Sequence, residues 1–120
     1  MATFKRFEDI LAWQKAREAN KLIFSLSASE KFSRDYTLKD QIRRASSSIM
    51  ANIAEGFGRH SDKEFAHFLN IAHASAFEVQ SHLYIALDLE YVEEDVFRDI
   101  YDRMSEIARM LYALSKHLRQ

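Results

Sequence analysis

The sequence predicts an all-α protein, an antiparallel up-down bundle of four helices. Three observations support this fold class. The chain has no Pro and only 2 Gly, so few residues interrupt a helix. Four stretches carry apolar residues three and four positions apart, as on one face of an α-helix. Short polar segments separate these stretches, which favours antiparallel neighbours. We expect a single domain over residues 1–120.

The first two helices are separated by the polar connection SASEKFSRDY. The first is expected from about Phe7 to Leu26, and the second from Asp35 or Thr37 to Glu55. The inward positions of the first helix are Ala12, Ala16, Ala19, Ile23 and Leu26. Those of the second helix are Leu38, Ile42, Ala45, Ile49 and Ile53.

The third helix is expected to start at Ser61, where SDKE forms a capping box with Glu64. The fourth begins near Glu93, with acidic residues at the positive end of its dipole. The inward positions of the third helix are Phe65, Leu69, Ala72, Ala76, Val79, Leu83 and Ala86. Those of the fourth helix are Phe97, Ile100, Met104, Ile107, Leu111, Leu114 and Leu118.

The stretch SSSIMANIAEGFGRHSDKE, residues 46–64, suggests a phosphate loop, a catalytic turn or a tight corner between helices. We interpret it as a corner. Small side chains suit closely approaching helices, and Gly56 suits the left-handed position after a helix. A phosphate loop is disfavoured because GFG follows no predicted strand and lacks the Lys-Ser/Thr of a P-loop.

This corner closely resembles the four-helix-bundle proteins encoded in intervening sequences of bacterial 23S rRNA genes, a family once labelled ribosomal. NIAEGFGR is the specific match, and FEDILAWQKARE and LDLEYV also resemble the family. The resemblance covers nearly the whole chain and implies no catalytic residue. The residues that match the family signature are Asn52, Glu55, Gly56, Gly58, Arg59, Ser61 and Glu64.

Two residues depart from the family pattern. Met50 stands where the family often has Pro, so we expect a less kinked second helix. Glu90 stands where the family often has Gly, so we expect a different turn after the third helix.

The resemblance also implies assembly. The accessory variability protein of diversity-generating retroelements belongs to the same superfamily; it is a pentameric barrel that binds nucleic acid and partners a reverse transcriptase. We therefore expect a homo-oligomer, with a pentamer as the specific form. The chain has more aromatic residues than four helical seams need, which is typical of a subunit interface: Trp13, Phe24, Phe57, Phe68, Phe77 and Tyr84.

The charges are unevenly distributed around a formal net charge of −1. Residues 1–63 carry 12 Lys and Arg against 8 Asp and Glu, whereas residues 64–120 carry 5 against 10. The two halves either attract each other between copies in a head-to-tail ring or neutralise each other inside one bundle. A dedicated nucleic-acid binder would be strongly basic overall, so RNA binding requires a local patch. The best candidates are Lys39, Arg43, Arg44, Arg59 and Lys63, together with His60.

No catalytic, metal or cofactor site is expected. The chain has no Cys, and Glu-x-x-His occurs once, at Glu64 and His67, rather than on facing helices. Some four-helix-bundle ribonucleases carry Arg and His closer together than the two pairs here, Arg59 with His67 and Arg109 with His117. With no apolar run of about 18 residues and no signal-peptide core, we expect a cytoplasmic protein.

We therefore predict a non-catalytic, oligomeric helical-bundle scaffold that binds RNA or a ribonucleoprotein partner. Two alternatives stay open. The first is an RNA-processing enzyme whose site forms between subunits, and the second is an adaptor that binds only proteins.

Overall fold

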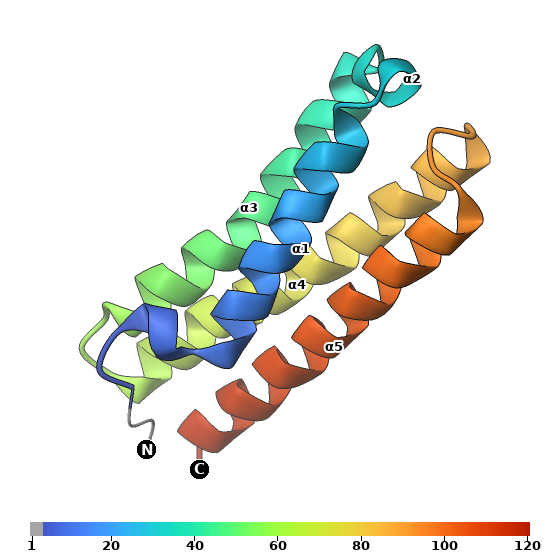
Figure 1. Cartoon of the computed structure of the whole chain (residues 1–120). Coiled ribbons are helices and arrows are strands. Elements are labelled where there is room, and N and C mark those ends of the chain that lie inside the picture. The colour runs from blue at the N-terminus through green and yellow to red at the C-terminus, as the bar shows by residue number, and fades with distance from the viewer. Residues whose placement is uncertain (1–3) are drawn as a thin grey trace.

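The computed structural model describes residues 4–120, and within them the regular structure is entirely helical. Four long helices run alternately up and down, so the predicted antiparallel bundle is confirmed (Figure 1). The bundle measures 45 × 20 × 19 Å. The elements, in chain order, are η1 (Phe7–Asp9), α1 (Leu11–Ser27), α2 (Glu30–Ser33), α3 (Tyr36–Phe57), α4 (Asp62–Asp88) and α5 (Glu94–Leu118).

The core follows the predicted apolar stripes. All predicted inward positions of α3 and α4 are buried, as are those of α5 except the half-buried Leu114. Each long helix packs against two neighbours, in the order α1, α3, α4, α5 and back to α1. The most extensive contacts lie between α3 and α4 and between α4 and α5.

The first helix differs from its prediction at both ends. A 3₁₀ turn at residues 7–9 precedes it, and the extended backbone of the buried Ile10 separates that turn from α1. At the other end Leu26 is half-buried, and Ser27 takes the core position. The Ser27 hydroxyl donates to the Ile23 carbonyl at 2.7 Å, which satisfies the buried polar group.

The connection after α1 is not simply polar. It contains α2, and Phe32 within it is fully buried. The Phe32 ring lies 5.3 Å from the ring of Tyr91, whose hydroxyl donates to Asp35 Oδ2 at 2.9 Å. These contacts tie the α1–α3 connection to the α4–α5 turn at one end of the bundle. The sequence reasoning missed them because a single apolar residue in a polar segment has no periodicity.

The two departures from the family pattern have different outcomes. Helix α3 continues without interruption through Met50, in line with the expectation of a less kinked helix. Glu90 adopts a φ of 60°, the left-handed conformation that Gly favours. The amide of Tyr91 donates to the carbonyl of Ala86 at 2.8 Å, and that of Glu90 to Leu87 at 3.0 Å, which forms a Schellman motif.

The described helices include none with the length and apolar character needed to cross a bilayer.

Candidate functional site

The corner between α3 and α4 is confirmed, but Gly56 does not have the predicted left-handed conformation. It lies inside α3, and neither glycine of the chain has a positive φ. A Cβ at Gly56 would lie 2.7 Å from Phe68 Cβ and 3.2 Å from the Phe65 carbonyl oxygen. The absence of a side chain therefore permits the close approach of α3 and α4.

The remaining corner residues cap and pair locally. The Glu64 amide donates to Ser61 Oγ at 3.1 Å, so the predicted N-cap of α4 is formed. The Glu64 carboxylate reaches back to the Ser61 hydroxyl at 3.4 Å. Arg59 pairs with Glu55 at 2.9 Å, and its guanidinium lies 4.7 Å from the centre of the Phe68 ring. The corner is thus held by local contacts that leave no open phosphate loop.

A polar layer joins the helices next to this corner. The hydroxyls of Ser48 on α3 and Ser75 on α4 lie 3.0 Å apart. The Asn52 amide donates to the carbonyl and hydroxyl of Ser48, at 2.8 and 2.9 Å. On the other side, Ser46 donates to Asn20 Oδ1 on α1 at 2.8 Å. The serine run and Asn52 therefore have packing roles that account for their positions.

The predicted basic patch is not one surface. Lys39, Arg43 and Arg44 lie in the first half of α3, whereas Arg59 and Lys63 lie beyond its other end. Sixteen residues of helix correspond to about 24 Å, so Arg43 and Arg59 are at opposite ends of the bundle. The structure thus brings the candidate RNA-binding residues together only as two separate groups.

Most of these cations already have partners. Arg43 Nε donates to Ser27 Oγ at 2.7 Å and Arg43 Nη2 to the Phe24 carbonyl at 3.1 Å, so this side chain caps the end of α1. Arg44 pairs with Asp40 at 3.1 Å on the exposed face of α3. Lys39 lies 5.2 Å from the ring centre of Tyr36, a side chain that is 74% exposed.

No catalytic or metal-binding constellation appears within residues 4–120. No three His, Cys, Asp or Glu side chains there lie close enough together to bind a metal ion. His82 pairs with Glu78 one turn away at 3.3 Å, as a surface pair would. The pKa of Tyr91 is raised by its hydrogen bond to Asp35, and that of Tyr101 by its hydrogen bond to the Tyr84 hydroxyl. Neither shift places an acid or base near neutral pH.

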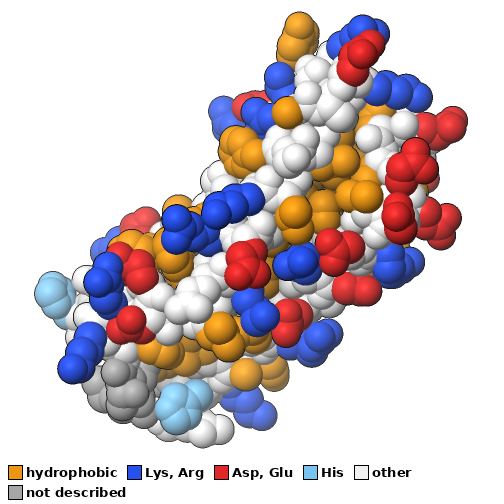
Figure 2. Space-filling view, in the orientation of Figure 1, with side chains coloured by type: hydrophobic (Ala, Val, Ile, Leu, Met, Phe, Trp, Pro, Cys, Tyr) orange, Lys and Arg blue, Asp and Glu red, His pale blue; other side chains and the backbone are white. Residues whose placement is uncertain are grey.

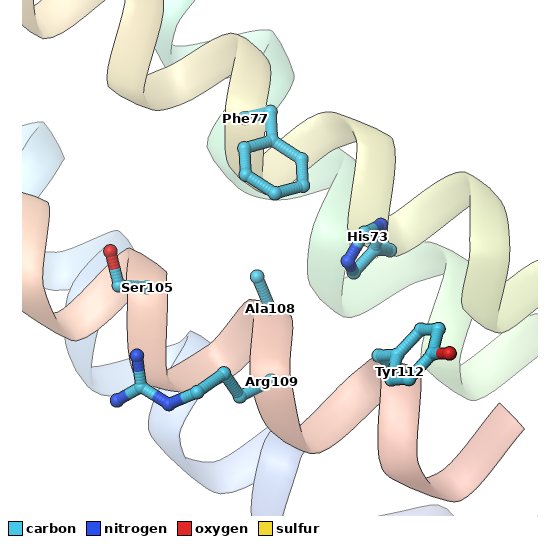
Figure 3. Close-up of a pocket in the computed structure, with 6 residues that line it drawn as sticks. All are labelled: His73, Phe77, Ser105, Ala108, Arg109 and Tyr112. Carbon is cyan, nitrogen blue, oxygen red and sulfur yellow. The ribbon is translucent and has the colours of Figure 1, made fainter. Parts of the chain in front are cut away.

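The most distinctive surface is an open groove of about 520 Å³ between α4 and α5. His73 and Phe77 project into it from α4, and Ala108, Arg109 and Tyr112 come from α5 (Figure 3). The His73 ring lies 4.9 Å from that of Phe77 and 6.3 Å from that of Tyr112. We call this feature the aromatic groove; its lining residues are His73, Phe77, Ser105, Ala108, Arg109 and Tyr112.

Exposed apolar side chains are most frequent on the α4–α5 hairpin that carries this groove. Of the ten large apolar side chains that are exposed in residues 4–120, seven belong to α4, α5 or the turn between them. They are Ile71, Phe77, Tyr84, Ile85, Leu89, Val96 and Tyr112. Phe77 and Tyr84 were among the aromatic residues predicted to exceed the needs of the core. The others were missed, although α4 is apolar on nearly all sides, which is a signal that sequence can provide.

The chain matches the family described as 23S rRNA-intervening sequence protein over residues 8–113. It belongs to this family. A solved structure of similar fold is that of a protein with unknown function from the S23 ribosomal protein family, from Bacteroides thetaiotaomicron VPI-5482. It superposes with a TM-score of 0.80 at 27% identity, covering 88% of this chain and 98% of that chain. No protein of curated function matched. As a member of the intervening-sequence family, the chain has the helical bundle that the resemblance implied.

Proposed function

We propose that this member of the intervening-sequence family is a non-catalytic scaffold that assembles as a homo-oligomer, with a pentameric ring as the specific form, and binds RNA or an RNA-associated protein. One observation carries the assembly: the gathering of exposed apolar side chains on the α4–α5 hairpin. Contiguous apolar patches on a folded chain are typical of protein interfaces. Aromatic residues such as Phe77 and Tyr112, 52% and 53% exposed, are enriched at such interfaces.

The proposal of a non-catalytic role is supported by comparing the chain with the residues that an enzyme would need. A hydrolase or nuclease requires an acid, base or metal positioned near a reacting atom. The groove offers one imidazole among aromatic rings, and the serines of the corner are engaged in packing. An RNA-processing site built between subunits is the rival, and a time course with labelled structured RNA separates the two. Binding without product supports the scaffold, and cleavage that increases with protein concentration contradicts it.

RNA binding is assigned to four cations whose charged groups reach solvent at the two ends of the bundle. Arg44 and Lys39 at one end, and Lys63 and Arg59 at the other, present charge to solvent. Five copies in a ring would repeat each small group five times, so that a chain with a net charge of −1 still forms a basic rim. The variant Lys39→Ala/Arg44→Ala is expected to weaken RNA binding severalfold at low salt. Unchanged binding in this variant would reject the assignment of the Lys39 and Arg44 end.

The assembly is tested by changing the α4 surface. The double variant Ile71→Ser/Ile85→Ser removes two exposed apolar side chains without touching the core. We expect a multiple of the chain mass for the native protein by light scattering after size exclusion, and a shift towards one chain for the variant. A control is Leu11→Ser, which removes an even more exposed apolar side chain at the start of α1. An equal effect of both changes would contradict the role of α4.

A further inference from the structure

We infer that the aromatic groove of one copy receives the acidic α4–α5 turn of a second copy, with Arg109 contacting the partner copy's carboxylate at position 90. This inference rests on the proposed self-association and specifies the surfaces that meet. Both surfaces belong to the same hairpin, so the contact is head-to-tail. It is carried by complementary charge, by complementary apolar surface and by one unusual backbone conformation.

The first argument is charge. Residues 88–95 carry five acidic residues and no Lys or Arg: Asp88, Glu90, Glu93, Glu94 and Asp95. Figure 2 shows acidic side chains gathered at the end of the molecule where α4 turns into α5. Residues 107–120 carry Arg109, Lys116 and Arg119 and no Asp or Glu, and residues 65–77 of the facing part of α4 carry no such charge at all. One hairpin therefore has an acidic turn at one end and a basic, aromatic region towards the other.

The second argument is distance. Arg109 and Asp95 are fourteen residues apart on one helix, about 21 Å, so the two regions cannot pair within one copy. This separation exceeds the screening length of about 8 Å at physiological salt. Within residues 4–120, no ion pair involves any of the five acidic residues or Arg109. Ion pairs inside the bundle instead use the middle of α5, where Glu106 pairs with Lys15 and Arg103 with Glu18.

The third argument is the conformation of Glu90. A φ of 60° is strained for a non-glycine residue, and within residues 4–120 the Glu90 side chain makes no hydrogen bond or ion pair that would offset the strain. Its neighbour Leu89 is 46% exposed at the tip of the turn. An apolar side chain beside a carboxylate matches a groove with aromatic walls and one guanidinium at its edge.

The contact uses different surfaces on the two copies. Each copy then offers one free groove and one free turn, so that the assembly closes into a ring or continues as a filament. The partner copy's turn covers part of the exposed apolar surface of the hairpin, including Phe77 and Tyr112. This accounts for apolar residues at both the groove and the turn.

A charge-exchange experiment tests the pairing. The single variants Arg109→Glu and Glu90→Arg place like charges opposite each other and are expected to weaken self-association at least tenfold by sedimentation velocity. The double variant Arg109→Glu/Glu90→Arg restores opposite charges and is expected to recover most of the association. Arg17→Glu is the control because it reverses an exposed charge on α1, away from the groove and the turn, and it should leave self-association unchanged. Circular dichroism melting of each variant verifies that it is folded.

A second variant guards against effects of folding. Glu90→Gly relieves the backbone strain, so the chain should become more stable while its association weakens. If the native protein is oligomeric and the single variants assemble as it does, the inference is wrong and the proposed assembly stands. Failure of the double variant to recover association, with both singles dissociated, also overturns the pairing. A native protein that is monomeric at every concentration overturns both proposals.

Discussion

Gly56 sets how closely α3 and α4 approach, because any side chain there would meet Phe68 and the Phe65 backbone. Glu90 sets how α4 ends, because its left-handed backbone closes the Schellman motif. Residue type alone would place the left-handed backbone at Gly56 and not at Glu90, and the structure shows the reverse. The sequence pattern assigns the left-handed conformation to Gly56, since Gly follows so many helices. It occurs instead at a Glu, because the hydrogen bonds of the turn and the docking of Tyr91 fix the chain direction there.

Gly56→Ala is expected to destabilise the fold by about 1–3 kcal/mol, the usual cost of overpacking a close contact. Gly58→Ala is the matched control. A Cβ at Gly58 would lie 3.5 Å from the Glu55 carbonyl oxygen, which is an ordinary contact distance. Urea denaturation followed by circular dichroism gives both free energies. Equal effects of the two substitutions would contradict the claim that the α3–α4 contact makes Gly56 necessary.

Glu90→Gly is expected to raise the free energy of unfolding by about 1 kcal/mol, because Gly adopts a positive φ without steric cost. Glu90→Ala removes the same carboxylate but keeps the strain, so it should leave stability nearly unchanged. The measurement is urea denaturation at high salt, where differences in surface charge are screened. A gain shared equally by both variants would trace the effect to charge.

Among the elements, α1 is fastened to α3 by a side chain that was predicted to bind RNA. Arg43 caps the end of α1 through Ser27 and the Phe24 carbonyl, and its guanidinium stacks 4.6 Å from the Phe24 ring centre. Its neighbour Arg44 makes only an exposed pair with Asp40. Two adjacent arginines thus have different structural roles, and the order of charges in the sequence cannot distinguish them.

Arg43→Ala is expected to cost about 1–2 kcal/mol, because it leaves the α1 terminus and Ser27 without a charged donor. Arg44→Ala should change stability by less than about 0.5 kcal/mol, as is usual for exposed ion pairs. Thermal melts of the two variants under identical conditions compare them directly. Equal melting temperatures would mean that the Arg43 cap contributes little.

The contact between the α2 region and the α4–α5 turn gives a pH-dependent stability. The hydrogen bond to Asp35 raises the pKa of Tyr91 above its unfolded value near 10. A raised folded-state pKa means that the contribution is fully present below about pH 10 and is lost as pH rises through the folded pKa. The difference in unfolding free energy between the native protein and Tyr91→Phe should therefore be constant from pH 7 to 9 and shrink above pH 10. A difference that stays constant up to pH 11 would contradict this role of Tyr91.

Much of the architecture could be predicted from the sequence at this scale. The limits of α3 and the starts of α4 and α5 were predicted to within a few residues, because Asp35, Ser61 and Glu93 occupy N-cap positions that their neighbours also indicate. Helix α2 and the burial of Phe32 were not predicted. A four-residue helix has no period to detect, and its burial depends on Tyr91, almost sixty residues away.

For the whole molecule, apolar periodicity determined the bundle but could not identify its functional face. Each stripe indicates which side of a helix is apolar, and the long stripes leave few ways to bury them together. Helix α4 is apolar on more sides than the bundle covers, and only the three-dimensional packing separates the covered positions, such as Leu69, from exposed ones such as Phe77. The basic residues do not form one patch for a related reason. The sequence shows that they are close along the chain, but α3 places the two groups at opposite ends of the bundle.

The charge asymmetry between the two halves of the sequence also changes meaning at this scale. Part of the asymmetry is neutralised inside the bundle by ion pairs between α1 and α5. This agrees with the second of the two expectations, neutralisation within one chain. The uncompensated part lies along the α4–α5 hairpin, with an acidic turn and a basic end. The attraction that we propose therefore joins the α4–α5 hairpin of one copy to the α4–α5 hairpin of another. It does not join the basic first half of one chain to the acidic second half of the next.

Self-association of the native protein is the central claim, and sedimentation velocity over a range of protein concentrations tests it most directly. We predict a species with the mass of several chains, near five. Its self-association should weaken as salt rises, and its mass should increase when structured RNA is added at low salt. A single species with the mass of one chain, at all concentrations and with or without RNA, would contradict the account and leave the α4–α5 surface without its proposed partner.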